Sequence, residues 1–104
     1  MNLNAINECP FLLLYFSSPA CNICRSTKPK VEEVVAKLGK VPFKEIDIHQ
    51  YPQLSGQHMV FSAPAVIALS YGKELFRFVR IIHLDQLQDK IERYLDLMGD
   101  QVIR

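Results

Sequence analysis

The sequence predicts a protein of the α/β class, in which a mixed four-stranded sheet carries helices on both faces. Short apolar runs bounded by turn residues alternate with longer segments in which apolar residues recur at helical spacing. Two of the predicted strands are joined by so short a turn that they must pair antiparallel. The chain has 104 residues, of which 49% are apolar, so we expect a single domain spanning residues 1–104.

The first half of the chain predicts a helix, a buried strand and a long second helix. Residues 2–8 favour a short helix that ends before Pro10. Residues 11–16 (FLLLYF) are continuously apolar, which is typical of a strand buried on both faces. From Cys21 the pattern becomes helical and closes at Gly39. The apolar side of this helix is formed by Val31, Val34, Val35 and Leu38.

The middle of the chain predicts three more strands. Residues 41–48 favour a strand parallel to the first, because a strand, helix and strand in this order form a right-handed crossover. Residues 50–59 favour a short helix. Residues 65–70 and 75–80 read as strands of a hairpin around the turn at 71–73.

The last segment predicts an amphipathic helix that ends at Gly99. One face of this helix carries Leu84, Leu87, Ile91, Tyr94, Leu95 and Met98. The expected order is therefore α-β-α-β-α-β-β-α, with helices packed on both sides of the sheet.

Charge and hydropathy argue against several classes of function. The formal net charge is +1, from twelve basic and eleven acidic residues, which favours neither nucleic acid nor an anionic membrane as a partner. No stretch approaches the roughly 20 apolar residues of a membrane-spanning helix. The first ten residues contain no Lys or Arg, so we expect no secretory signal. We expect a cytoplasmic monomer.

Two of the three cysteines form the motif Cys21-Asn22-Ile23-Cys24 at the junction of the first strand and the second helix. At a helix N-terminus, unpaired backbone N–H groups and the helix dipole favour a thiolate. Cys24 lies one turn further in and should be more buried. We therefore expect Cys21 to be the attacking thiolate and Cys24 the resolving thiol of a redox pair.

Two other interpretations of the cysteine pair stay open. A structural metal site needs four ligands, and Cys9 with His49, His58 or His83 is the available source of the others. The chain has no second Cys-x-x-Cys motif, which argues against this site. Alternatively, the two cysteines are inert residues of a binding domain. We expect no metal.

The motif and its surroundings resemble the thioredoxin family. The shared features are the apolar strand, the Cys-x-x-Cys motif, Pro29 five residues after Cys24, and a later apolar strand opened by Pro64, followed by a hairpin and a terminal helix. The resemblance covers about residues 8–98 and implies a thioredoxin-like fold.

The resemblance also implies a function. Pro64 should be cis and face the dithiol, and Ala63 should offer backbone hydrogen bonds to an extended protein substrate. The same proline would keep a metal from binding between the cysteines. The chain would be a thiol–disulfide oxidoreductase for protein disulfides that needs no bound cofactor. An NADPH-dependent flavoprotein reductase would recharge it.

The chain departs from the family pattern near the motif. Tyr15 occupies the position of the family's buried aspartate, which helps to move the proton of the resolving thiol, and Glu45 lies near the position of its partner lysine. These changes favour an alternative function, a redox-sensing or protein-interaction module with little turnover. Ile23 either contacts a substrate or packs against Pro64.

Overall fold

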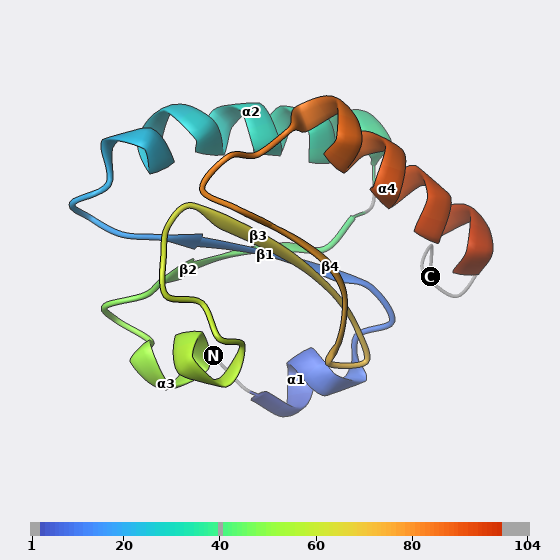
Figure 1. Ribbon diagram of the computed structural model, residues 1–104. Coiled ribbons are helices and arrows are strands. Elements are labelled where there is room, and N and C mark those ends of the chain that lie inside the picture. The colour runs from blue at the N-terminus through green and yellow to red at the C-terminus, as the bar shows by residue number, and fades with distance from the viewer. Residues whose placement is uncertain (1–2, 40, 99–104) are drawn as a thin grey trace.

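The computed structural model describes residues 3–39 and 41–98, which form a mixed four-stranded sheet between two layers of helices (Figure 1). This confirms the predicted class and the predicted order of elements. The elements are α1 (Leu3–Glu8), β1 (Leu12–Ser17), α2 (Asn22–Leu38), β2 (Phe43–Asp47), α3 (Pro52–Gln57), β3 (Ala65–Ser70), β4 (Lys73–Val79) and α4 (Leu84–Met98).

The strand order across the sheet is β2-β1-β3-β4, so β1 lies inside the sheet. The pairing of β1 with β2 is parallel, as the helical crossover through α2 requires. The β1–β3 and β3–β4 pairs are antiparallel. The β3–β4 hairpin turns through Tyr71 and Gly72, both at positive φ, which is the backbone conformation that a tight hairpin needs.

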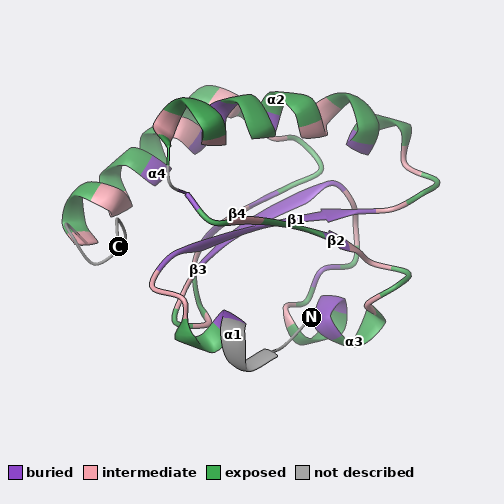
Figure 2. Ribbon diagram, turned by 180° about the vertical axis from the view of Figure 1, so that it is seen from behind, coloured by how far each residue is buried: buried purple, intermediate pink, exposed green. Residues whose placement is uncertain are grey.

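The two faces of the sheet are covered by different helices. In Figure 1, α2 and α4 lie on one side of the sheet and α1 and α3 on the other. The buried strands lie between helices whose outer surfaces are exposed (Figure 2). Every residue of β1 is buried, as predicted for a strand with two covered faces.

Alternation along β1 sends side chains into two separate cores. The core beneath α2 and α4 includes Phe11, Leu13, Tyr15, Val31, Val66, Phe76, Leu87 and Ile91. The core against α1 and α3 includes Ile6, Leu12, Leu14, Phe16, Ile46, Leu54, Val60 and Ile67. Tyr15 therefore faces α2, the helix that begins at the cysteine pair.

The predicted ends of the helices agree with the structure within one or two residues. Helix α2 contains Pro29 and is followed by Gly39 at a φ of 67°. The short helix predicted within residues 50–59 begins with Pro52 in its first turn, where the missing N–H costs nothing. Helix α4 is described as far as Met98, and its predicted stop at Gly99 lies outside the described residues, as does residue 2. Within residues 3–39 and 41–98, no helix is both long and apolar enough to span a membrane.

Candidate active site

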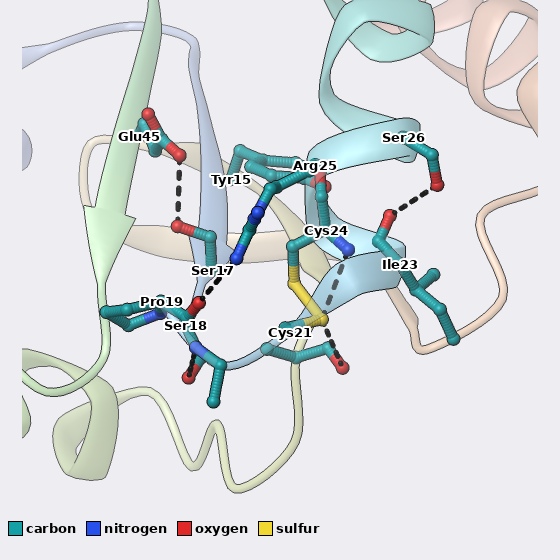
Figure 3. Close-up of a disulfide and its surroundings, with 12 residues drawn as sticks. Tyr15, Ser17, Ser18, Pro19, Cys21, Ile23, Cys24, Arg25, Ser26 and Glu45 are labelled. Carbon is teal, nitrogen blue, oxygen red and sulfur yellow. Dashed lines mark hydrogen bonds between the residues drawn. A yellow bond between two sulfur atoms is a disulfide. The ribbon is translucent and has the colours of Figure 1, made fainter.

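Cys21 and Cys24 are joined in a disulfide at the point where β1 leads into α2 (Figure 3). Their Cα atoms are 5.3 Å apart, within the range that disulfides span. Cys21 is the N-cap residue of α2 and is half-buried, whereas Cys24 lies in the first turn and is 3% exposed. The predicted difference in burial between the two sulfurs is therefore present.

The start of α2 directs a backbone donor at the outer sulfur. The Cys24 N–H donates a hydrogen bond to Cys21 Sγ at 3.1 Å, so the sulfur takes the role that a Ser or Asp oxygen plays at other helix N-termini. The same donor and the helix dipole would stabilise a negative charge on this sulfur after reduction. The geometry thus suits Cys21 as a nucleophile.

The loop between α3 and β3 lies against Cys21. The peptide bond between Ala63 and Pro64 is cis, as the family resemblance implied. Cys21 Sγ is 3.8 Å from the carbonyl oxygen of Ala63, a distance at which a reduced thiol can donate a hydrogen bond. The structure therefore brings together Cys21, Cys24, Ala63 and Pro64. Of these, Cys21 and Ala63 are 42 residues apart along the chain.

Two large apolar side chains are exposed, one between the two cysteines and one in the loop that contains Ala63 and Pro64. Ile23, between the cysteines, is 61% exposed, which is inconsistent with its packing against Pro64. Phe61, two residues before Ala63, is 81% exposed. Exposed large apolar residues near a reactive group are typical of a contact surface. The sequence analysis missed Phe61, although an aromatic residue just ahead of the proline-opened strand was a signal that could have identified it.

Arg77 on β4 holds the beginning of the same loop. Its guanidinium donates to the carbonyl oxygens of His58 (2.6 Å) and Met59 (3.3 Å). Glu74 accepts two hydrogen bonds from Arg77, and this contact lowers the pKa of the Glu74 carboxyl. The pair fixes the loop to the edge strand of the sheet. This role depends on contacts between residues that are distant in the sequence, so the sequence analysis did not find it.

On the buried side of the disulfide, Tyr15 contacts the helix rather than a sulfur. Its hydroxyl donates to the carbonyl oxygen of Cys24 at 2.9 Å. Burial, and secondarily the charge of Glu45, raises the pKa of Tyr15 to about 12. Tyr15 therefore remains a neutral hydrogen-bond donor near neutral pH.

Beside Cys24 lies an open cleft of about 700 Å³ between α2, β1 and β2. Glu45 in this cleft forms an ion pair with Lys28 at 2.7 Å and accepts a hydrogen bond from the Ser17 hydroxyl at 3.0 Å (Figure 3). The hydrogen bond with Glu45 raises the pKa of Lys28. Glu45 is paired in register with Tyr15 on the neighbouring strand, so both side chains are on the α2 face of the sheet.

The residues considered for a metal site do not come together. Cys9 and Cys21 lie at opposite ends of β1, and the Cys9 thiol donates to the carbonyl oxygen of Phe11. The His58 ring packs near Phe16, in the core on the α3 side. Across residues 3–39 and 41–98, no group of three His, Cys, Asp or Glu side chains is placed to hold a metal ion.

Known proteins match most of the chain. The family model described as "Thioredoxin" matches residues 3–93. The thioredoxin-like protein YdfQ of Bacillus subtilis is 27% identical over 90 residues, which are 86% of this chain and 80% of that protein. Bovine mitochondrial thioredoxin is 32% identical over 81 residues, and the match spans 77% of this chain but only 49% of the relative.

A solved structure agrees with these sequence matches. Thioredoxin 1 of the thermophilic eubacterium Thermosipho africanus superposes with a TM-score of 0.74 and 31% identity, over 83% of this chain and 96% of that one. The residues that the family model matches, 3–93, include Cys21, Cys24 and Pro64. The chain belongs to the thioredoxin family.

Proposed function

We propose that the protein is an enzyme that reduces disulfides in other proteins through the Cys21–Cys24 dithiol. The reduced Cys21 thiolate attacks one sulfur of the substrate disulfide, and the other substrate sulfur leaves as a thiolate and takes up a proton. Cys24 then attacks Cys21, which forms the internal disulfide and releases the second substrate sulfur. Two electrons pass from the protein to its substrate.

One observation carries this proposal: the accessible sulfur is the one at the helix N-cap, and the buried sulfur is within bonding distance of it. This asymmetry assigns the attack to Cys21 and the resolution to Cys24. Membership of the thioredoxin family supports thiol–disulfide exchange as the general class of reaction.

The surface around the disulfide supports a protein as the substrate. The Ala63 backbone lies beside Cys21 and suits an extended segment that carries the target disulfide. Ile23, between the two cysteines, and Phe61, two residues before Ala63, are exposed apolar side chains that a protein substrate can cover. We further propose that the protein is a cytoplasmic monomer and that an NADPH-dependent flavoprotein reductase returns it to the dithiol form.

The proposal is tested by measuring reduction of a disulfide-bonded protein, with dithiothreitol as the electron donor. The wild type should accelerate the reaction well above dithiothreitol alone, and Cys21→Ser should not. Equal rates for the two proteins would refute the enzymatic function.

The position of Tyr15 favours a second candidate function, a redox-sensing or interaction module without repeated turnover. Its hydroxyl is committed to the Cys24 carbonyl and is a poor base, so it does not help Cys24 to lose a proton. A module of this kind would form the internal disulfide once and stay oxidised in the presence of substrate. A single burst of substrate reduction, equal to the amount of protein and not renewed by dithiothreitol, would support this candidate.

A further inference from the structure

Arg80 has an unusual backbone conformation beside the cis-proline loop. It follows β4 and has a φ of 68°, a region that residues with a Cβ atom rarely occupy. The N–H of Ile81 donates to the carbonyl oxygen of Val79 at 2.8 Å, so Arg80 is the central residue of a γ-turn of the rare, strained type. Glycine would adopt this conformation without strain. Strain of this kind is concentrated at functional sites, so the Arg80 side chain is a candidate for a role there.

A short series of contacts joins this turn to the disulfide. The backbone N–H of Arg80 donates to the carbonyl oxygen of Pro64 at 2.7 Å. Pro64 follows Ala63, whose carbonyl oxygen is 3.8 Å from Cys21 Sγ. The turn therefore borders the backbone against which the proposed function places an extended substrate segment. The long side chain of Arg80 can reach substrate residues that flank the attacked sulfur.

Arg80 adds an exposed positive charge to this part of the surface. The ion pairs formed among residues 3–39 and 41–98 are Lys28 with Glu45 and Arg77 with Glu74. The charges of those four residues offset one another in pairs, whereas Arg80 has no carboxylate partner within the same described ranges. Its guanidinium is therefore available to pair with a carboxylate that a substrate supplies.

The neighbours of Arg80 in the turn are apolar and exposed. Val79 is 41% exposed, and Ile81 is 69% exposed. Val79 is paired in register with Ala65, the residue after Pro64, so the turn lies alongside the cis-proline loop. A cation between two apolar side chains complements a partner segment that carries a carboxylate among apolar residues, and it repels a basic segment.

We propose that Arg80 is a specificity-determining residue, which pairs with a carboxylate of the substrate and directs the protein to disulfides flanked by acidic residues. The inference rests on the proposed function, since it names the class of protein disulfide that the Cys21–Cys24 dithiol reduces. The Cys21 thiolate by itself repels an acidic substrate, because both are anionic. The positive charge of Arg80 offsets this repulsion and gives acidic disulfides an advantage over neutral ones.

Two symmetric peptide disulfides test the proposal. Each is a dimer of a short peptide with blocked ends and a central cysteine, which is flanked on both sides by glutamate in one peptide and by glutamine in the other. The reduced protein carries Cys9→Ser, so that its only thiols are Cys21 and Cys24. It converts each dimer into two peptide thiols and becomes oxidised to the internal disulfide. Acid quenching and chromatography give the two rate constants, and the glutamate-to-glutamine ratio measures the acidic preference.

Removal of the Arg80 charge should reduce this preference. Arg80→Gln should lower the glutamate-to-glutamine ratio by about twofold to fivefold, the size expected when an exposed ion pair is lost. Arg80→Lys should retain most of the ratio, because it keeps the positive charge. The ratio of the wild type should also fall at about 1 M salt, where charges are screened beyond about 3 Å.

The matched control is Arg93→Gln, which removes an exposed arginine from α4. Its ratio should equal that of the wild type, because the charge is removed away from the cis-proline loop. A ratio that falls by less than about twofold in Arg80→Gln, or that falls equally in Arg93→Gln, would overturn the inference.

Arg80→Gly separates the role of the side chain from that of the backbone. Glycine accepts a positive φ, so the melting temperature should be no lower than that of the wild type, while the preference for glutamate should be lost as in Arg80→Gln. A glycine variant that melts well below the wild type, or that keeps the wild-type ratio, would contradict the proposed role.

The outcomes also distinguish this inference from the proposed function, because the peptide ratio is measured in a single turnover without a protein substrate. Failure to reduce protein disulfides, together with a ratio that depends on Arg80, would refute the proposed function alone. Reduction of protein disulfides, together with equal ratios in the wild type and Arg80→Gln, would refute the inference alone.

Discussion

The Tyr15 hydroxyl donates a 2.9 Å hydrogen bond to the carbonyl oxygen of Cys24. This contact joins the centre of the sheet to the first turn of α2, the turn that carries both cysteines. It comes from the position at which the family resemblance leads one to expect an acid. Tyr15 thus supports the helix turn, and its partner in register on the adjacent strand is Glu45.

The environment of Tyr15 makes the fold sensitive to alkaline pH. Its pKa is about 12 in the folded protein against 10.0 for an ordinary tyrosine, so the unfolded chain ionises first. The stabilisation is complete below pH 10 and is lost as pH rises towards 12. Two pKa units correspond to roughly 3 kcal/mol of unfolding free energy.

Urea unfolding between pH 8 and pH 11 measures this effect. The wild type should lose stability faster than Tyr15→Phe across the upper part of this range. Tyr71→Phe, at an exposed tyrosine, is the matched control and should follow the wild type. Identical pH profiles for the wild type and Tyr15→Phe would contradict the assignment.

His58 makes the fold sensitive to acid. Burial lowers the pKa of its ring, with Glu74 opposing and Arg77 reinforcing the shift. The unfolded chain therefore binds a proton that the folded state resists. Stability from this group is present above the ordinary pKa of 6.5 and is lost as pH falls through the lowered value. The melting temperature of His58→Gln should fall less than that of the wild type between pH 7 and pH 5, whereas His83→Gln should not differ from the wild type.

The difference between the two sulfurs should appear in their reactivity. In the reduced protein, iodoacetamide should label Cys21 before Cys24, because Cys21 lies at the helix N-cap and Cys24 is buried. Cys9 is an internal control, since it is also half-buried but lies away from a helix N-terminus. Peptide mass spectrometry at neutral pH measures all three rates. Faster labelling of Cys24, or equal labelling of Cys21 and Cys9, would contradict the proposed roles.

The exposed apolar residues should determine the affinity for protein substrates. Ile23→Ser and Phe61→Ser should each raise KM by several-fold, since burying such a side chain contributes about 1.5–3 kcal/mol at most. The value of kcat should change little, because neither side chain touches the sulfurs in the proposed step. Leu97→Ser, at a 75% exposed leucine on α4, is the matched control. Unchanged KM values in both site variants would remove these residues from the substrate surface.

Much of the fold could be predicted because it depends on local pattern. The buried run of β1 and the helical spacing of α2 meet at Cys21, so the sequence alone placed one sulfur at a helix N-terminus. The parallel β1–β2 pair and the β3–β4 hairpin were predicted from the connections between the strands, but the pairing of β1 with β3 was not, because periodicity reports burial and not which strand pairs with which. The place of Arg77 relative to the cysteine pair depends on that third pairing. Phe61 was missed for a different reason: an apolar residue beside a buried strand is ordinarily counted as core, although its place just ahead of Pro64 was a signal, and in the structure it is exposed.

Trapping of a mixed disulfide tests the division of roles between Cys21 and Cys24 most directly. The variants Cys24→Ser and Cys21→Ser are each combined with Cys9→Ser, so that a single thiol remains in each protein. After incubation with a disulfide-bonded protein, covalent complexes are separated without reductant and identified by mass spectrometry. We expect the protein that retains Cys21 to accumulate the mixed disulfide and the protein that retains Cys24 to accumulate none. Equal trapping by the two, or trapping through Cys24 alone, would contradict the account.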